Sequence, residues 1–173
     1  MSTLGATVAR LAQIVTALQH RLPVPIVRLG YRIAYRVAQV IWFVLRPDVH
    51  GVKGMLRDGD RVLLVRHTYG DRRRWDVPGG HAHSGEEPAD AVLREMREEL
   101  GIEAAWEPVG SIPSTTDHKH ERVHCFVARR PQGTAQLVLA RGEISEAQWF
   151  ALDALPTRIG ELSLRSLALL PRD

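Results

Sequence analysis

A glycine-rich loop followed by an acidic helix, between residues 75 and 102, constrains the fold of this chain more than any other stretch. Pro78-Gly79-Gly80 interrupts an apolar run, because proline and glycine stop a strand and let the backbone come close to another group. From about Gly85 apolar residues recur at a helical spacing, and Gly101 is placed to end the helix. The stretch therefore predicts a loop that feeds a helix.

The start of this predicted helix carries further local signals. Ser84, with Glu87 three residues later, fits a capping box, and Pro88 suits a first helical turn. The recurring apolar positions that define the helix are Ala89, Val92, Leu93, Met96 and Leu100.

Three glutamates of the predicted helix share one face. Glu95, Glu98 and Glu99 are spaced at i, i+3 and i+4, a single turn apart. Like charges this close repel one another, so the arrangement costs stability unless a cation compensates it. Magnesium and manganese take carboxylate and carbonyl oxygens, and magnesium commonly shares its coordination sphere with substrate phosphates. The spacing predicts a site for a metal ion and a phosphate-bearing ligand, in which Arg94 could orient a carboxylate.

The same stretch resembles the Nudix box at every defining position and with unbroken spacing. The resemblance implies a Nudix hydrolase, an enzyme that cleaves a pyrophosphate linkage in a nucleoside diphosphate joined to another group. It also implies an α/β (α+β) fold, in which a mixed β-sheet is sandwiched between α-helices. The positions that carry the resemblance are Gly80, Glu86, Arg94, Glu95, Met96, Glu98, Glu99, Gly101 and Ile102.

The resemblance further implies roles for individual residues and a cofactor, Mg²⁺ or Mn²⁺. Arg94 is an orienting partner, Glu86 supports the start of the helix, and Gly101 belongs to the structural part of the box. The alternatives are a surface helix with a solvated acidic face and a Nudix fold that has lost activity. The implied metal ligands are the carbonyl of Gly80 and the carboxylates of Glu95, Glu98 and Glu99.

Hydrolysis of a pyrophosphate needs a neutralised diphosphate and a water directed at one phosphorus. Divalent ions held by the box glutamates would supply the neutralisation, and a carboxylate must accept the proton as general base. In the family this carboxylate comes from the box or from a later loop. Glu95 and Glu143 are therefore the candidates, with Glu146 and Glu121 behind them. The alternative for Glu143 is a solvated loop residue.

Basic and imidazole side chains around the box are candidates for substrate binding. Arg74 ends a run of three arginines just before the box, and arginine gives forked donors to phosphate oxygens. His81 and His83 follow the glycine pair, and imidazoles near a metal site could bias it toward manganese or a softer ion, or contact a phosphate or base. The alternatives are solvated loop arginines and histidines that serve only in polar packing.

The N-terminal quarter differs from the rest of the chain. From Met1 to Arg46 there are six arginines and no acidic residue, while the remainder holds more acidic than basic residues. Apolar residues recur at a helical period from Thr3 to Leu22; prolines then break the pattern, and a second helix is expected from Pro25 to Leu45. The sequence thus predicts a basic amphipathic helical hairpin over residues 1–49 and a Nudix domain over residues 50–173.

The second helix of this hairpin is apolar over most of its circumference, so it needs a surface to pack on. A transmembrane span is disfavoured, since the longest nearly apolar run, Val37 to Leu45, is about half of the roughly 20 residues required. We expect residues 1–46 to pack on protein, including a second copy in a homodimer, or to make peripheral membrane contact through their arginines. Leu29, Ile33, Val37, Val40 and Val44 share one face, and Tyr31, Tyr35, Ala38, Trp42 and Leu45 lie beside it.

The rest of the chain has the pattern of short strands and a final helix. Val52–Leu56 and Arg61–Val65 flank Asp58-Gly59, which is a strong hairpin signal. Further strands are expected at Glu107–Ile112, Glu121–Ala128, Leu137–Leu139 and Gln148–Ala151, and a helix at Arg158–Leu170.

Composition indicates a soluble globular protein, with 45% hydrophobic and 25% charged residues. The single cysteine, Cys125, excludes an intramolecular disulfide and suits a reducing, cytoplasmic compartment; we expect a packed thiol. The expected partner is a small nucleotide, for instance a nucleotide sugar or nucleoside triphosphate, and not a nucleic acid, because the catalytic part is net acidic. The rivals are a non-catalytic ligand sensor or membrane-tethered scaffold, and an RNA 5′-end pyrophosphohydrolase, which should have a basic groove.

Overall fold

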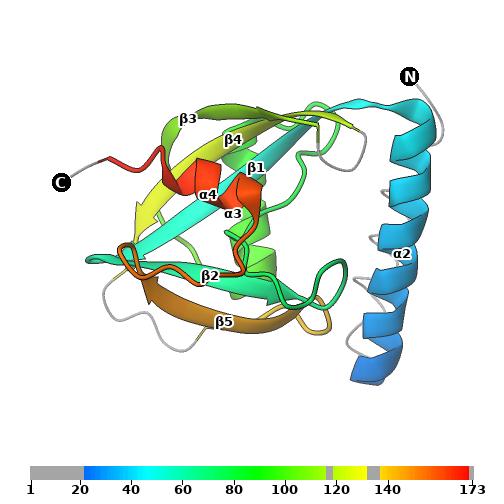
Figure 1. The fold of residues 1–173 in the computed structure, drawn as a ribbon, viewed down its shortest axis with the longest axis horizontal. Helices are drawn as coiled ribbons and strands as arrows, with labels where there is room; N and C mark the ends of the chain where they lie inside the picture. The colour runs from blue at the N-terminus through cyan, green and yellow to red at the C-terminus, as the bar shows by residue number, and fades with distance from the viewer. Residues whose placement is uncertain (1–21, 116–118, 132–136, 172–173) are drawn as a thin grey trace.

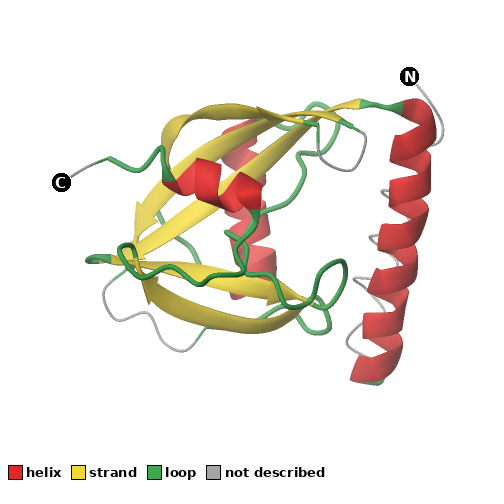
Figure 2. Cartoon of the chain, viewed as in Figure 1, coloured by secondary structure: helices red, strands yellow, loops and turns green. Residues whose placement is uncertain are grey.

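A five-stranded mixed sheet forms the centre of the fold in a computed structural model, which describes residues 22–115, 119–131 and 137–171. The strand order is β3-β4-β1-β2-β5, and β1 and β4 are parallel while the other pairs are antiparallel. Helices α3 and α4 lie on either side of the sheet, and α2 stands at one end of it (Figures 1 and 2). The elements are α2 (Val24–Leu45), β1 (Asp48–Asp58), β2 (Arg61–His67), α3 (Pro88–Leu100), β3 (Glu107–Ser114), β4 (His120–Arg129), β5 (Ile144–Ala151) and α4 (Glu161–Leu167).

Apolar side chains alternate between the two faces of the sheet, as the period of two of a strand requires. Each face therefore has its own buried cluster, one against α3 and one against α4, and the predicted sandwich of helices and sheet is confirmed. The packed thiol of Cys125 belongs to the α4 side. The α3 cluster includes Leu56, Leu63, Val65, Val92 and Met96, and the α4 cluster includes Met55, Val62, Leu64, Val123 and Leu167.

The start of α3 differs from the prediction, whereas its end agrees. The helix begins at Pro88 and not near Gly85, because Gly85 has a φ of +80° and belongs to a turn. The predicted capping box of Ser84 is wrong: Glu87 is the N-cap residue, and no side chain caps the helix. Gly101 ends the helix in the left-handed conformation, with a φ of 66°, as predicted.

Two of the predicted apolar positions of α3, Ala89 and Leu93, are exposed. The other three predicted positions, Val92, Met96 and Leu100, are buried, and Ala91 and Glu99 complete the buried face. The buried residues of the helix are Ala91, Val92, Met96, Glu99 and Leu100.

Two further elements are shorter than predicted or absent. The final helix covers only Glu161–Leu167, because the residues before it pair with the strand-like segment at Trp75, whose N–H donates to Arg158 O at 2.8 Å. The predicted strand at Leu137–Leu139 does not form. Val138 in this segment and Ala140 just after it instead donate their N–H groups to carbonyls at the end of α3, at 3.0 and 2.8 Å.

Helix α2 matches the second predicted helix, while the first, Thr3–Leu22, lies almost wholly outside the described residues. The row of tyrosine and tryptophan side chains faces the sheet domain, where Tyr31 and Tyr35 stack near Tyr69 with ring centroids 6.1 and 5.2 Å apart. The more apolar row faces away and is 52–69% exposed, at Leu29, Ile33, Val37, Val40 and Val44. None of the helices in the described ranges is both long and apolar enough to span a bilayer.

Candidate active site

The Pro78-Gly79-Gly80 loop is clamped between β1 and α3. Val52 N–H donates to Gly80 O at 2.9 Å, and Gly79 N–H donates to Glu99 Oε2 at 3.0 Å. A Cβ added at Gly79 would lie 2.1 Å from Val52 O, and one at Gly80 would lie 2.4 Å from Glu95 Oε1. Both positions therefore exclude side chains, which brings the loop backbone directly onto two carboxylates of α3.

Arg94 ties the loop after the glycines to this helix. Its Nε donates to Glu86 Oε1 and its Nη2 donates to Glu86 Oε2, both at 2.9 Å. Its Nη1 donates to Glu95 Oε1 at 2.9 Å, and Nη2 also donates to His81 O at 3.0 Å. The hydrogen bonds from Arg94 lower the pKa of Glu86 to about 2. Glu86 also accepts from His83 N–H at 2.7 Å, so it connects the loop just before the N-cap residue to the helix. The Arg94 guanidinium thus contacts Glu86 and Glu95 at once, a geometry that suits the predicted orienting role of Arg94.

The three helical glutamates differ in their surroundings. Glu99 is buried and Glu95 is largely buried, and burial raises the pKa of both carboxyls. For Glu99 the negative charges of Glu143 and Glu95 raise the pKa further. Glu98 lies at the rim, with its side chain 56% exposed and 3.5 Å from Arg94 Nη1. The predicted face is therefore divided into two inner carboxylates and one outer carboxylate.

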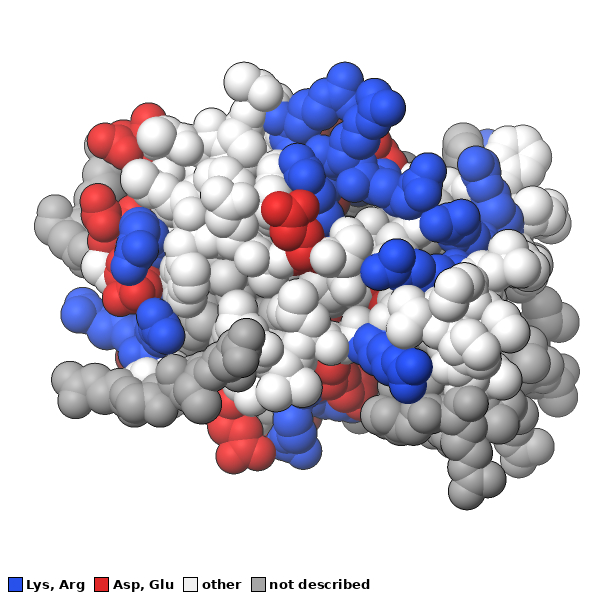
Figure 3. Space-filling view, turned by 90° about the horizontal axis from the view of Figure 1, so that it is seen from below, with Lys and Arg blue, Asp and Glu red and all other residues white. Residues whose placement is uncertain are grey.

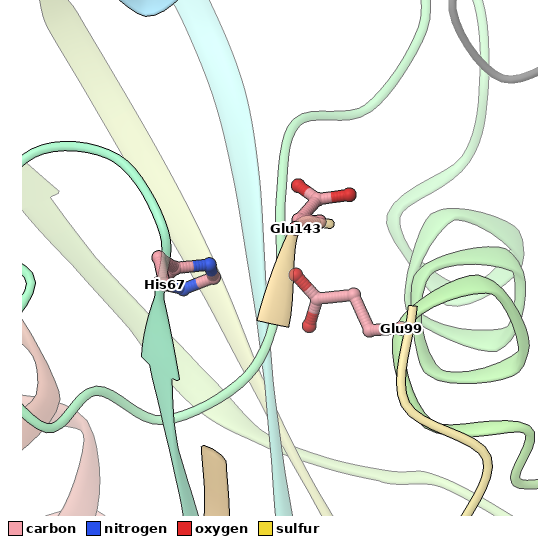
Figure 4. A group of neighbouring side chains, drawn as sticks. All are labelled: His67, Glu99 and Glu143. Atoms are coloured by element: carbon pink, nitrogen blue, oxygen red, sulfur yellow. The ribbon is translucent and has the colours of Figure 1, made fainter. Parts of the chain in front are cut away.

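The inner carboxylates meet side chains from two other elements. Ligand atoms of His67, Glu99 and Glu143 all lie within 4.8 Å of one another (Figure 4). His67 ends β2, and Glu143 immediately precedes β5, so pairing of these strands brings the two residues beside α3. Glu143 Oε1 accepts from Tyr69 Oη at 3.2 Å, and Tyr31 of α2 also hydrogen-bonds to this carboxylate.

The environment of Glu143 favours its neutral form in the absence of a cation. Burial, followed by the charge of Glu95, raises the pKa of Glu143 to about 7, even though the tyrosine hydrogen bonds act in the opposite direction. Burial also lowers the pKa of His67 to about 4, so its imidazole is neutral near pH 7. A group of two carboxylates and a neutral imidazole is a suitable donor set for a divalent metal ion.

A cavity of about 280 Å³ opens beside the glycine loop. Its walls include cationic side chains from separate parts of the chain and the rings of Tyr35 and Tyr69. Lysine and arginine side chains also gather on the neighbouring surface toward α2 (Figure 3). The wall also holds acidic side chains: Asp76 pairs with Arg74 and Glu121 pairs with Lys119. A mixed lining of this kind suits an anionic ligand that is bound together with metal ions. The cationic and imidazole lining residues are Lys53, His67, Arg74, His81 and Lys119.

The predicted binding residues fall in different places. Arg74 lines the cavity and pairs with Asp76 at 2.9 Å, and His81 also lines it. His83 is 59% exposed and is not among the lining residues, so the structure does not bring it to the cavity. Arg72 and Arg73, which precede Arg74 in the loop, are also exposed and are not among the residues that line the cavity.

The two reserve candidates for the general base lie away from the inner carboxylates. Glu121 is at another wall of the cavity, 3.2 Å from both His81 Nε2 and Lys119 Nζ. Burial opposes ionisation of Glu121, but the His81 hydrogen bond and the Lys119 charge outweigh it and lower the pKa to about 2. Glu146 pairs with Arg66 at 2.9 Å on the surface. Of the three later candidates, Glu143 is the one that lies with Glu99 in the group of possible metal ligands.

Several residues of this region were missed from the sequence. His67 and Lys53 lie on strands, and the available signal was that each is a polar residue in or directly after an apolar run. No sequence pattern indicated that Tyr31 and Tyr69 would lie beside each other in this region, because their contact depends on how α2 packs on the sheet domain. Lys119 stands in the loop before β4 and contacts His81, Glu121 and the ring of Trp42.

The sequence over this fold matches one known family. The family model for the NUDIX domain matches residues 46–170. This chain belongs to the NUDIX family. The family predicted from the sequence is thereby confirmed. Helix α2 ends at Leu45, just before the matched residues, so it lies outside the part of the chain that the NUDIX model matches.

Relatives that match part of this chain are named as a hydrolase and a pyrophosphatase. NAD-capped RNA hydrolase NudC of Pseudomonas aeruginosa is 37% identical over 99 residues, which cover 57% of this chain and 34% of that protein. ADP-ribose pyrophosphatase of Mycobacterium tuberculosis is 37% identical over 69 residues, which cover 39% of this chain and 33% of that protein. This chain therefore matches about a third of the length of these relatives.

Solved structures show the same fold. The crystal structure of a MutT NUDIX hydrolase from Burkholderia pseudomallei superposes with a TM-score of 0.65 at 22% identity, over 72% of this chain and 98% of that chain. The sheet, α3 and α4 all lie within the residues that the NUDIX model matches, and together they form the NUDIX fold.

Proposed function

We propose that this chain hydrolyses a pyrophosphate linkage in a nucleoside diphosphate joined to another group, with Mg²⁺ or Mn²⁺ as cofactor. The observation that carries the proposal is the group formed by Glu99, Glu143 and His67, whose ligand atoms lie within 4.8 Å of one another. His67 also lines the cavity, whose wall includes the cationic side chains of Lys53 and Arg74. Membership of the NUDIX family and the names of the hydrolase relatives support it.

The residues present fit a divalent cation. Two carboxylates within 4.8 Å of each other repel unless one is protonated or a cation lies between them. A bound divalent ion neutralises charge on the diphosphate. Lys53 and Arg74 of the cavity wall would bind the remaining phosphate oxygens, and Arg94 holds Glu95 in place.

The reaction transfers a phosphoryl group to water. Water attacks one phosphorus, the bond from that phosphorus to the bridging oxygen breaks, and the bridging oxygen leaves with the other phosphate. We propose Glu95 as the carboxylate that takes the proton from water. Arg94 occupies its Oε1, and Oε2 accepts no hydrogen bond from the residues that the structure describes. Glu143 remains the alternative base.

The nucleotide would lie in the cavity beside the aromatic rings. Tyr35 and Tyr69 flank the opening with a centroid separation of 5.2 Å, and a nucleobase can stack on such rings. A cavity of this size suits a small nucleotide better than a folded partner. Nucleotide sugars, nucleoside triphosphates, ADP-ribose and NAD-type dinucleotides share the linkage that we propose is cut.

An RNA 5′ end is the second candidate substrate. Basic side chains gather on one face of the molecule, toward the side on which α2 lies (Figure 3), and such a surface could bind RNA phosphates. The likeness to NAD-capped RNA hydrolase NudC is a further reason to include RNA among the substrates that are tested. A non-catalytic ligand sensor is the remaining alternative.

A panel of substrates tests these proposals. We would incubate the protein with nucleoside triphosphates, nucleotide sugars, ADP-ribose, NAD and 5′-capped or triphosphorylated RNA, with Mg²⁺ or Mn²⁺. The site variant is Glu99→Gln, and the matched control is Glu103→Gln, whose side chain is 83% exposed. Turnover of one class by the wild type and by Glu103→Gln, with loss in Glu99→Gln, supports the enzyme. Binding of a nucleotide without turnover under either metal supports the sensor.

The exposed apolar row of α2 suggests a role for the N-terminal segment. We propose that the row from Leu29 to Val44 contacts a second copy of this chain, because its exposed apolar residues recur every three or four residues and so form one continuous helix face that can pair with another helix. Light scattering after gel filtration should give a dimer for the wild type and a monomer for Val37→Glu. A monomeric wild type that sediments with anionic vesicles would favour peripheral membrane contact instead.

A further inference from the structure

We propose that His67 is a nitrogen ligand of the metal centre, which gives this site a mixed nitrogen and oxygen donor set and a preference for Mn²⁺ over Mg²⁺. The inference rests on the proposed metal-dependent function but concerns a residue outside the glutamate-rich box. Imidazole suits transition metals, whereas magnesium favours oxygen ligands.

The local backbone aims His67 at the carboxylates. The pairing of β2 with β5 shifts in register between Arg66 and His67, and such an irregularity redirects a side chain next to it. The next residue fixes the strand end, because Thr68 N–H donates to Glu143 O at 2.8 Å and its hydroxyl donates to Gly142 O at 2.5 Å. Figure 4 shows the imidazole turned toward Glu99 and Glu143.

The imidazole has no other polar partner among the described residues. Its Nδ1 is buried without a hydrogen bond, and none is found for the other ring nitrogen in the described part of the chain. The ring of Tyr69 lies 5.0 Å from it at an angle of 34°, which fixes the ring without satisfying a nitrogen. A buried polar atom without a partner costs free energy. A metal ion held jointly with Glu99 and Glu143 would satisfy the ring.

Electron paramagnetic resonance of Mn²⁺ tests the assignment without any substrate. Bound Mn²⁺ in the wild type should show electron spin echo modulation from a directly coordinated imidazole ¹⁴N, and ¹⁵N-histidine labelling should replace that modulation. The variant His67→Gln should lose the modulation and bind Mn²⁺ about tenfold or more weakly, with a smaller loss for Mg²⁺. The matched control His81→Gln, altered at the cavity wall, should keep the modulation.

The outcomes separate this inference from the proposed function. Mn²⁺ bound by the wild type without nitrogen modulation overturns the His67 assignment, even if turnover is seen. Modulation that survives in folded His67→Gln also overturns it. Modulation that depends on His67 in a protein with no turnover on any substrate supports the ligand assignment and refutes the proposed function. The labelled wild type decides the presence of a histidine ligand even if His67→Gln does not fold.

Discussion

Replacing Glu143 by glutamine should stabilise the metal-free protein at alkaline pH. Burial raises the pKa of this carboxyl from 4.5 to about 7 in the folded chain. Between these values the folded state holds a proton that the unfolded state releases, so stability falls as pH rises and the loss is complete above about pH 7. At about 1.4 kcal/mol for each pKa unit, the penalty is on the order of 3 kcal/mol. The amide of Gln is neutral and avoids it.

The assay is thermal unfolding in the presence of a chelator near pH 5 and near pH 8.5. For a chain of this length, about 3 kcal/mol corresponds to a rise in Tm of about 6–12 °C. Glu143→Gln should show this rise near pH 8.5 and only a small part of it near pH 5. Divalent metal should raise the Tm of the wild type more than that of the variant. The control Glu146→Gln, in a surface ion pair with Arg66, should leave the pH dependence unchanged. An equal Tm difference between Glu143→Gln and the wild type at both pH values would refute the reasoning.

Three further predictions concern turnover on whichever substrate is cleaved. Glu95→Gln should lower kcat by about 10²–10⁴-fold if its carboxylate is the base; a smaller loss than in Glu143→Gln would transfer the role to Glu143. Gly80→Ala should reduce activity at least tenfold, because the added Cβ would lie 2.4 Å from Glu95 Oε1, whereas Gly30→Ala meets no atom within 4 Å and should be silent in the same assay. Tyr31→Phe should lower kcat by about tenfold, since it removes a hydrogen bond to the Glu143 carboxylate worth about 1.5 kcal/mol; an unchanged rate constant would show that this hydrogen bond is dispensable for catalysis.

The sequence predicted the box region well because the constraints there are local. The loop glycines, the helix and its left-handed end at Gly101 follow from spacing over a few residues, and the structure contains all three. The β1–β2 hairpin is a local feature of the same kind. The start of α3 was wrong because a turn at Gly85 and a capping box are both compatible with the same short polar sequence.

The rest of the site depends on contacts between residues far apart in the chain. His67 and Glu143 meet Glu99 only because β2 pairs with β5 beside α3, and no spacing rule joins positions 76 residues apart. The i, i+3, i+4 spacing placed Glu98 with the inner glutamates, whereas in the folded chain its side chain is 56% exposed at the rim. The sequence likewise gave no indication of which row of α2 would face the sheet.

Position-resolved hydrolysis in ¹⁸O-labelled water tests the central claim most directly. The cleaved substrate from the panel would be incubated with Mg²⁺ or Mn²⁺, and the products analysed by mass spectrometry. The account predicts two products divided at the pyrophosphate bridge, with one ¹⁸O atom in only one of the new phosphate groups, and no products with Glu99→Gln. Cleavage outside the bridge, products that form equally with Glu99→Gln, or no cleavage of any candidate by the wild type would contradict it.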